Sequence, residues 1–73
     1  MAQQTRSERV AKYTQMTRSD LAEAASTALE TAEWAEQNGK QGLLDLQHER
    51  LAAMDEALPE GEDAGSVAQE VQA

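Results

Sequence analysis

A stripe of small apolar side chains at helical spacing is the feature that most constrains the fold of this chain. The stripe holds one leucine and four alanines, separated by four, three, four and three residues: Leu21, Ala25, Ala28, Ala32 and Ala35. Such spacing places all five on one face of an α-helix. Because alanine projects little beyond the backbone, the stripe predicts a helix against which a second helix packs closely.

Residues 41–58 supply the larger apolar side chains that this first helix lacks. Leu44, Leu51 and Leu58 recur every seven residues, which is typical of a second amphipathic helix. We expect this leucine row to form the seam against the alanine stripe.

The signals between and after the two helices favour a hairpin. Asn38-Gly39 is typical of a helix end in which glycine takes the left-handed conformation, and Pro59 ends the second helix. A link as short as Asn38–Gly42 folds two helices back antiparallel. The predicted fold class is therefore all-α, with a helical hairpin over residues 19–58.

The N-terminal segment has a clear helix start and an ambiguous middle. Thr5 and Glu8 stand as in a capping box, and no Pro or Gly occurs between Thr5 and Asn38, so we expect one long helix over residues 6–38, kinked near residues 17–19. Against continuity, Ser19-Asp20 resembles a new N-cap, and residues 12–17 alternate enough to form a short strand. Helix, loop and β-ribbon all stay open for residues 12–17, and helix is our prediction.

The core inventory is thin for a folded monomer. Leu and Val together number ten of 73 residues, Ile and Phe are missing, and fourteen residues are Ala. Chains of this size rarely bury enough apolar surface alone to offset the conformational entropy of folding. We therefore expect a homo-oligomer, most simply a homodimer.

Charge divides the chain into segments of opposite sign. Residues 1–18 hold four basic residues against Glu8, a balance of +3, whereas residues 19–73 carry a balance of −11. We interpret residues 1–18 as a basic, helical N-terminal arm. Residues 59–73 combine acids with small polar residues, and we expect a flexible, disordered acidic tail there.

No catalytic constellation is visible, so the sequence predicts a non-enzymatic protein without a cofactor. The chain has one His and no Cys, and it lacks a Gly-rich phosphate loop. Asp45, His48 and Glu49 share a helix face, but the pattern occurs once, and we interpret it as an exposed polar face without a metal. Without an apolar run that could form a signal peptide or a membrane span, a cytoplasmic location is the default.

The candidate binding residues for a protein partner lie on both expected helices. Trp34 is about 140° from the centre of the alanine stripe at 100° per residue, so a hairpin would leave this only Trp facing water, where tryptophan is a common interface anchor. The full set is Trp34, Met16, Tyr13, Arg9, Lys12 and Leu51.

Residues 49–65 carry one resemblance. Their sequence, ERLAAMDEALPEGEDAG, resembles the segment that follows the DNA-binding domain in ParD-type ribbon-helix-helix antitoxins. That resemblance implies a dimeric DNA-binding repressor, with Lys12 to Thr17 as a β-ribbon and a C-terminal segment that wraps a toxin. We keep it as the alternative to a helical protein that binds another protein, with DNA as the alternative partner.

Overall fold

The computed structural model describes residues 5–72, and these form helices joined by short loops. The helices are α1 (Arg6–Gln15), α2 (Arg18–Gln37), α3 (Gln41–Ala57) and α4 (Ala64–Gln72). No strand occurs within residues 5–72. The all-α prediction is confirmed, and residues 12–15 are helical.

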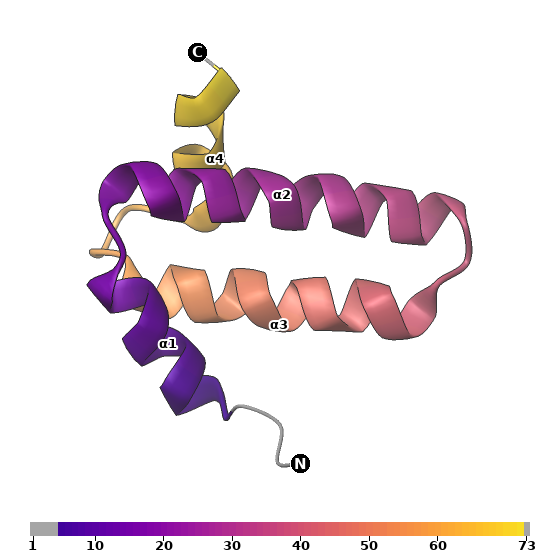
Figure 1. Ribbon diagram of the computed structural model, residues 1–73, viewed down its shortest axis with the longest axis horizontal. Helices are drawn as coiled ribbons and strands as arrows, with labels where there is room; N and C mark the ends of the chain where they lie inside the picture. Colours follow the sequence, from indigo (N-terminus) through magenta and orange to yellow (C-terminus); the bar gives the residue numbers. More distant parts are fainter. Residues whose placement is uncertain (1–4, 73) are drawn as a thin grey trace.

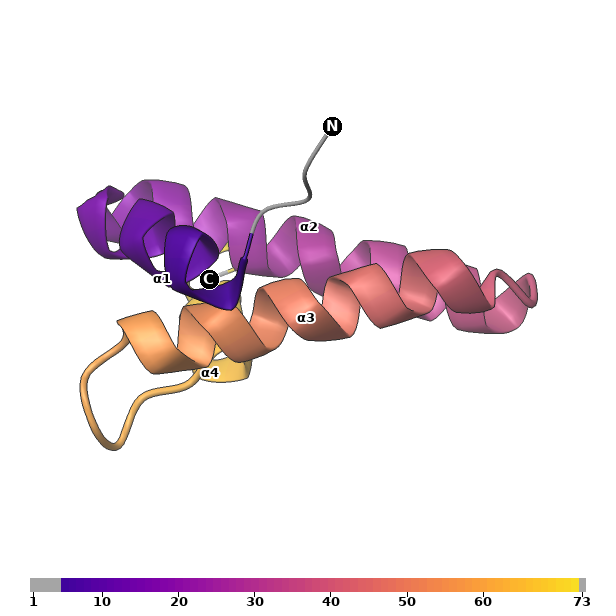
Figure 2. The same ribbon diagram turned by 90° about the horizontal axis from the view of Figure 1, so that it is seen from below.

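The helices are arranged around a central pair, with one further helix on each side of it. α2 and α3 run antiparallel side by side, α1 lies over α3 at one end, and α4 crosses α2 on the opposite side (Figures 1 and 2). The shortest dimension is 19 Å, about two helix diameters. α2 and α3 form the centre of the fold, because α2 packs on α3 and α4 and α3 packs on α2 and α1.

The expected continuous helix over residues 6–38 is wrong at Met16 and Thr17. Both residues are extended, and the Thr17 side chain accepts a hydrogen bond from the Asp20 N–H at 3.1 Å, so a new helix begins at Arg18. The Met16 N–H returns to the Tyr13 carbonyl and closes α1. The break allows α1 to fold across α3 and bury Tyr13.

The loop between α2 and α3 has the geometry that its sequence predicts. Gly39 has a φ of +66°, which a side chain would strain. The Lys40 N–H donates to the Ala35 carbonyl at 2.8 Å, and the Gly39 N–H donates to the Glu36 carbonyl at 3.4 Å. These paired bonds form a Schellman motif, which satisfies the last carbonyls of α2 and turns the chain back.

The leucine row of α3 is not its buried centre. Leu44, Leu51 and Leu58 are only partly buried, whereas Ala53 and Met54 are 1% exposed. The prediction assumed one partner helix, but α3 packs on both α2 and α1. A second partner widens the buried face and moves its centre away from the leucine row.

The prediction of a flexible tail is also wrong for residues 64–72, because these residues form α4. Residues 1–4 of the expected arm and residue 73 of the expected tail lie outside the described residues. Ala64, Val67 and Ala68 are almost completely buried. Asp63 accepts from the Ser66 N–H, and Asp55 of α3 accepts from the Ala64 N–H, each at 2.7 Å. These two carboxylates satisfy the first N–H groups of α4.

A charged cluster made of Arg18, Glu62 and Glu70 holds α4 against the start of α2. The Arg18 guanidinium bonds Glu62 in the preceding loop and Glu70 of α4, the latter at 2.7 Å. Its hydrogen bonds lower the pKa of both carboxyl groups below the ordinary glutamate value. The hydrogen bond from the Ser66 N–H likewise lowers the pKa of Asp63.

Across residues 5–72, no helix combines the length and the apolar character needed to cross a bilayer.

Candidate functional site: the groove between α1 and α2

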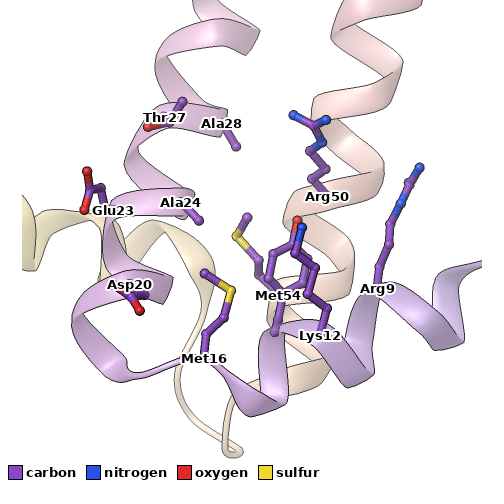
Figure 3. A pocket seen from close by; sticks show the side chains of 11 residues that line it. Arg9, Lys12, Met16, Asp20, Glu23, Ala24, Thr27, Ala28, Arg50 and Met54 are labelled. Atoms are coloured by element: carbon purple, nitrogen blue, oxygen red, sulfur yellow. The ribbon is translucent and has the colours of Figure 1, made fainter. Parts of the chain in front are cut away.

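A groove lies between α1 and α2, and α3 forms its base. It exists because α1 packs on α3 while direct packing between α1 and α2 is sparse. The groove has a volume of about 500 Å³, which is within the range of ligand pockets. Figure 3 shows its lining side chains, which are Arg9, Lys12, Tyr13, Met16, Asp20, Glu23, Ala24, Thr27, Ala28, Arg50 and Met54.

The floor of the groove is apolar and adaptable. Tyr13 and Met54 are buried at the base, and Met16 of the α1–α2 connection is partly buried beside them. Ala24 and Ala28 leave room because their side chains end at Cβ. Thioethers fill irregular spaces and pack well against aromatic rings, so this floor suits an inserted apolar or aromatic side chain.

The walls of the groove carry opposite charges. Lys12 of α1 and Arg50 of α3 stand on one side, and Asp20 and Glu23 of α2 stand on the other (Figure 3). All four are exposed. None of them forms an ion pair with any residue in the described part of the chain. The groove therefore has a basic wall and an acidic wall, both free to meet charges on a partner.

Arg9 differs from the other cations of the groove. Its guanidinium lies 3.5 Å from the Glu49 carboxylate, and its side chain is 15% exposed. Arg6 forms a similar bridge to Glu56 at 3.2 Å. These two bridges tie α1 to α3, so Arg9 helps to build the groove wall as well as to charge it.

The structure brings together four of the six predicted partner-binding residues. Arg9, Lys12, Tyr13 and Met16 all line the groove. Tyr13 is 7% exposed and belongs to the core, so it forms part of the groove floor and presents little surface for binding.

The other two predicted residues lie elsewhere. Trp34 is 51% exposed near the C-terminal end of α2, and Leu51 packs partly buried against the core.

Sequence reasoning missed the residues that complete the groove. Asp20, Glu23, Arg50 and Met54 line it, yet their significance depends on α1 folding back at Met16. Thr17 followed by Asp20 was the available signal, since Thr at an N-cap accepts from the N–H three residues later.

The described residues show no arrangement suited to a metal ion. No group of three or more His, Asp or Glu side chains in residues 5–72 has the proximity that metal binding needs. His48 is exposed on α3, away from the groove lining. The groove can therefore make apolar contacts at its floor and ion pairs at its walls.

Comparison with known proteins adds no relative. No protein-family model, no curated protein and no solved structure gave a significant match to the chain.

Proposed function

We propose that this protein is a non-enzymatic interaction protein, a small regulator or inhibitor that holds a segment of a protein partner in the groove between α1 and α2. The observation that carries the proposal is the apolar floor between a basic and an acidic wall whose charges are unpaired within the described chain. An apolar anchor in a pocket with complementary charges at its rim is the usual design of a specific protein interface.

The charged walls favour a protein partner over a nucleic acid. A phosphate backbone carries one sign of charge, so Asp20 and Glu23 would repel it while Lys12 and Arg50 attract it. The acidic net charge of −8 acts in the same direction. A protein segment can place an acid on one side of its apolar anchor and a base on the other.

The proposal can be tested by capturing binding proteins from the native host with the wild-type chain and with matched charge-reversal variants. The wild-type chain, a Lys12→Glu/Arg50→Glu variant and a Lys40→Glu control would each be immobilised and the bound proteins compared. Lys40 lies in the α2–α3 loop outside the groove, and it is exposed like the two groove cations. The proposal expects a partner retained by wild type and by Lys40→Glu but lost by the groove variant.

Photo-crosslinking can locate the partner on the surface of this protein. A photo-crosslinking side chain placed at Thr27, which lines the groove, should join the same partner, whereas one placed at Glu60 should not. Partners captured equally by wild type, by the Lys12→Glu/Arg50→Glu variant and by the Lys40→Glu control would refute the groove as the binding site.

A further inference from the structure

The exposed side chain of Trp34 lies on the side of α2 that forms the acidic wall of the groove. Trp34 follows Thr27 by seven residues and Glu23 by eleven, and both spacings return to the same helix face within about 20°. Thr27 and Glu23 line the groove. Trp34 therefore projects from the groove side of α2, about 10 Å beyond Thr27 along the helix axis.

Apolar surface continues from the groove towards Trp34. On α3, Leu43 and Leu46 precede Arg50 by seven and four residues, so they lie on the same side of the helix as Arg50, and both are partly buried. The antiparallel course of α2 and α3 places this end of α3 beside the end of α2 that carries Trp34 (Figure 1). The two leucines and Trp34 therefore extend the apolar floor of the groove along the α2–α3 pair.

The groove and this apolar extension together have the length of a short helix. The α2 residues that line the groove run from Asp20 to Ala28, so the groove follows the axis of α2. Trp34 stands fourteen residues beyond Asp20, which is about 21 Å of helix. A bound helix of about four turns would cover this distance.

The walls of the groove favour a helical occupant over an extended one. Every residue that lines the groove belongs to a helix except Met16, and no strand occurs within residues 5–72. The described part of the chain therefore offers no strand edge to which an extended segment could pair its backbone. Backbone N–H and C=O groups left unpaired against an apolar floor cost free energy, whereas a helix satisfies its own. Ala24 and Ala28 also allow a helix to approach closely.

We propose that the occupant of the groove is an amphipathic α-helix of a partner protein, laid along α2 from Asp20 to Trp34. This inference rests on the proposed function and names the segment that the partner supplies. One apolar anchor of the helix contacts Met16 and Met54, and a second packs beside Trp34. Ala24 in the groove and Trp34 lie about 15 Å apart along α2, so the two anchors stand at about positions i and i+11 of the bound helix.

Charge complementarity assigns the polar flanks of the bound helix. The flank over α1 and α3 meets Lys12 and Arg50, so it carries Asp or Glu. The flank over α2 meets Asp20 and Glu23, so it carries Lys or Arg. Glu30 lies one turn before Trp34, is exposed, and has no ion-pair partner in the described part of the chain, so the acidic side continues towards Trp34.

Selection from a displayed library of random peptides of about 16 residues, carried out on the purified full chain, tests the inference. The enriched peptides should repeat apolar residues at helical spacing over about eleven positions, with acids on one flank and bases on the other. A synthetic copy of an enriched peptide, made without tryptophan, should gain helical circular dichroism on binding. The emission of Trp34, the only tryptophan of the chain, should shift to shorter wavelength in the same titration.

Matched variants locate the peptide on the surface. Trp34→Ala should weaken peptide binding by roughly 30-fold or more, as expected for an interface tryptophan. Leu29→Ala is the control, because Leu29 is also exposed on α2 but lies about 140° around the helix from Trp34, and it should leave binding unchanged. On Glu23→Lys, the same library should enrich an acid in place of a base on the flank over α2. Far-UV circular dichroism of each variant verifies that the helices are kept.

The possible outcomes separate this inference from the proposed function. Peptides without helical spacing, no enriched peptide at all, or equal binding to wild type and Trp34→Ala would overturn the helical occupant, while partner capture that depends on Lys12 and Arg50 would still support the proposed function. A dimer of the purified chain that Lys12→Glu/Arg50→Glu dissociates would overturn the inference as well, because a second copy would then fill the groove. Host capture that is unchanged in Lys12→Glu/Arg50→Glu would instead refute the proposed function.

Discussion

Replacement of Gln47 by Met should stabilise the protein, because Gln47 is a polar side chain buried without a full set of partners. It lies on α3, is 1% exposed, and its Oε1 atom accepts no hydrogen bond from any described residue. A buried polar group without a partner costs about 1–3 kcal/mol. Methionine has a similar length and shape, so it removes this cost with little change in packing volume.

The expected gain is large relative to the total stability. A domain of this length has a free energy of unfolding of roughly 4–11 kcal/mol at the usual value per residue. Gln47→Met should add about 1–3 kcal/mol, and each kcal/mol raises the melting temperature of a domain this small by about 4–8 °C.

Urea denaturation followed by circular dichroism at fixed protein concentration measures the effect. The midpoint should rise while the slope stays constant, which shows that stability has changed and the unfolded state has not. Gln69→Met is the matched control, since Gln69 is exposed on α4 and the same substitution there should change the midpoint little. A lower midpoint for Gln47→Met, with the control silent, would show that the Gln47 carbonyl is satisfied and that the reasoning fails.

Three further predictions concern the packing, the α1–α2 break and the acid stability. Met54→Ala should destabilise the protein by about 2–5 kcal/mol and more than Leu51→Ala, because Met54 is buried and Leu51 is only partly so; urea midpoints of both variants compare them. Thr17→Ala should cost about 1 kcal/mol by removing the N-cap of α2, whereas Thr14→Ala within α1 should cost much less in the same assay. Arg18 lowers the pKa of Glu62 and Glu70 below 4.5 in the folded protein, so at acidic pH the unfolded chain binds more protons than the folded one. The stabilisation that these two carboxylates provide is therefore present above pH 4.5 and is lost as the pH falls through their folded-state pKa values. The loss, followed as the urea midpoint between about pH 6 and pH 2, should be smaller in Arg18→Gln, and an equal loss in both proteins would contradict the role of Arg18.

The ends of the helices depend on nearby residues, and the sequence predicts several of them. Thr5 caps α1 through the Glu8 N–H, Gly39 takes the left-handed conformation after α2, and α3 stops before Pro59. Each of these signals acts through one side chain or one backbone angle within a few residues of the boundary. Such signals need no knowledge of the remainder of the fold.

The fourth helix shows where local signals become insufficient. Residues 63–71 contain an N-cap in Asp63 and an apolar stripe in Ala64, Val67, Ala68 and Val71, yet a nine-residue helix is marginal in water by itself. Its stability comes from burial against α2, from the Asp55 carboxylate of α3 and from Arg18. None of these contacts is visible in the composition of the segment, which resembles a solvated acidic tail.

The sequence by itself determined that the chain is helical, where α1 begins, where α2 ends, where α3 begins and ends, and that alanine lines the first long face. Only the tertiary structure decided which faces are buried and that a groove exists. Two extended residues, Met16 and Thr17, turn α1 back over α3, and this brings Lys12 opposite Glu23 across an apolar floor. The physical reason is that helix formation depends on hydrogen bonds four residues apart, whereas a groove depends on contacts between segments tens of residues apart.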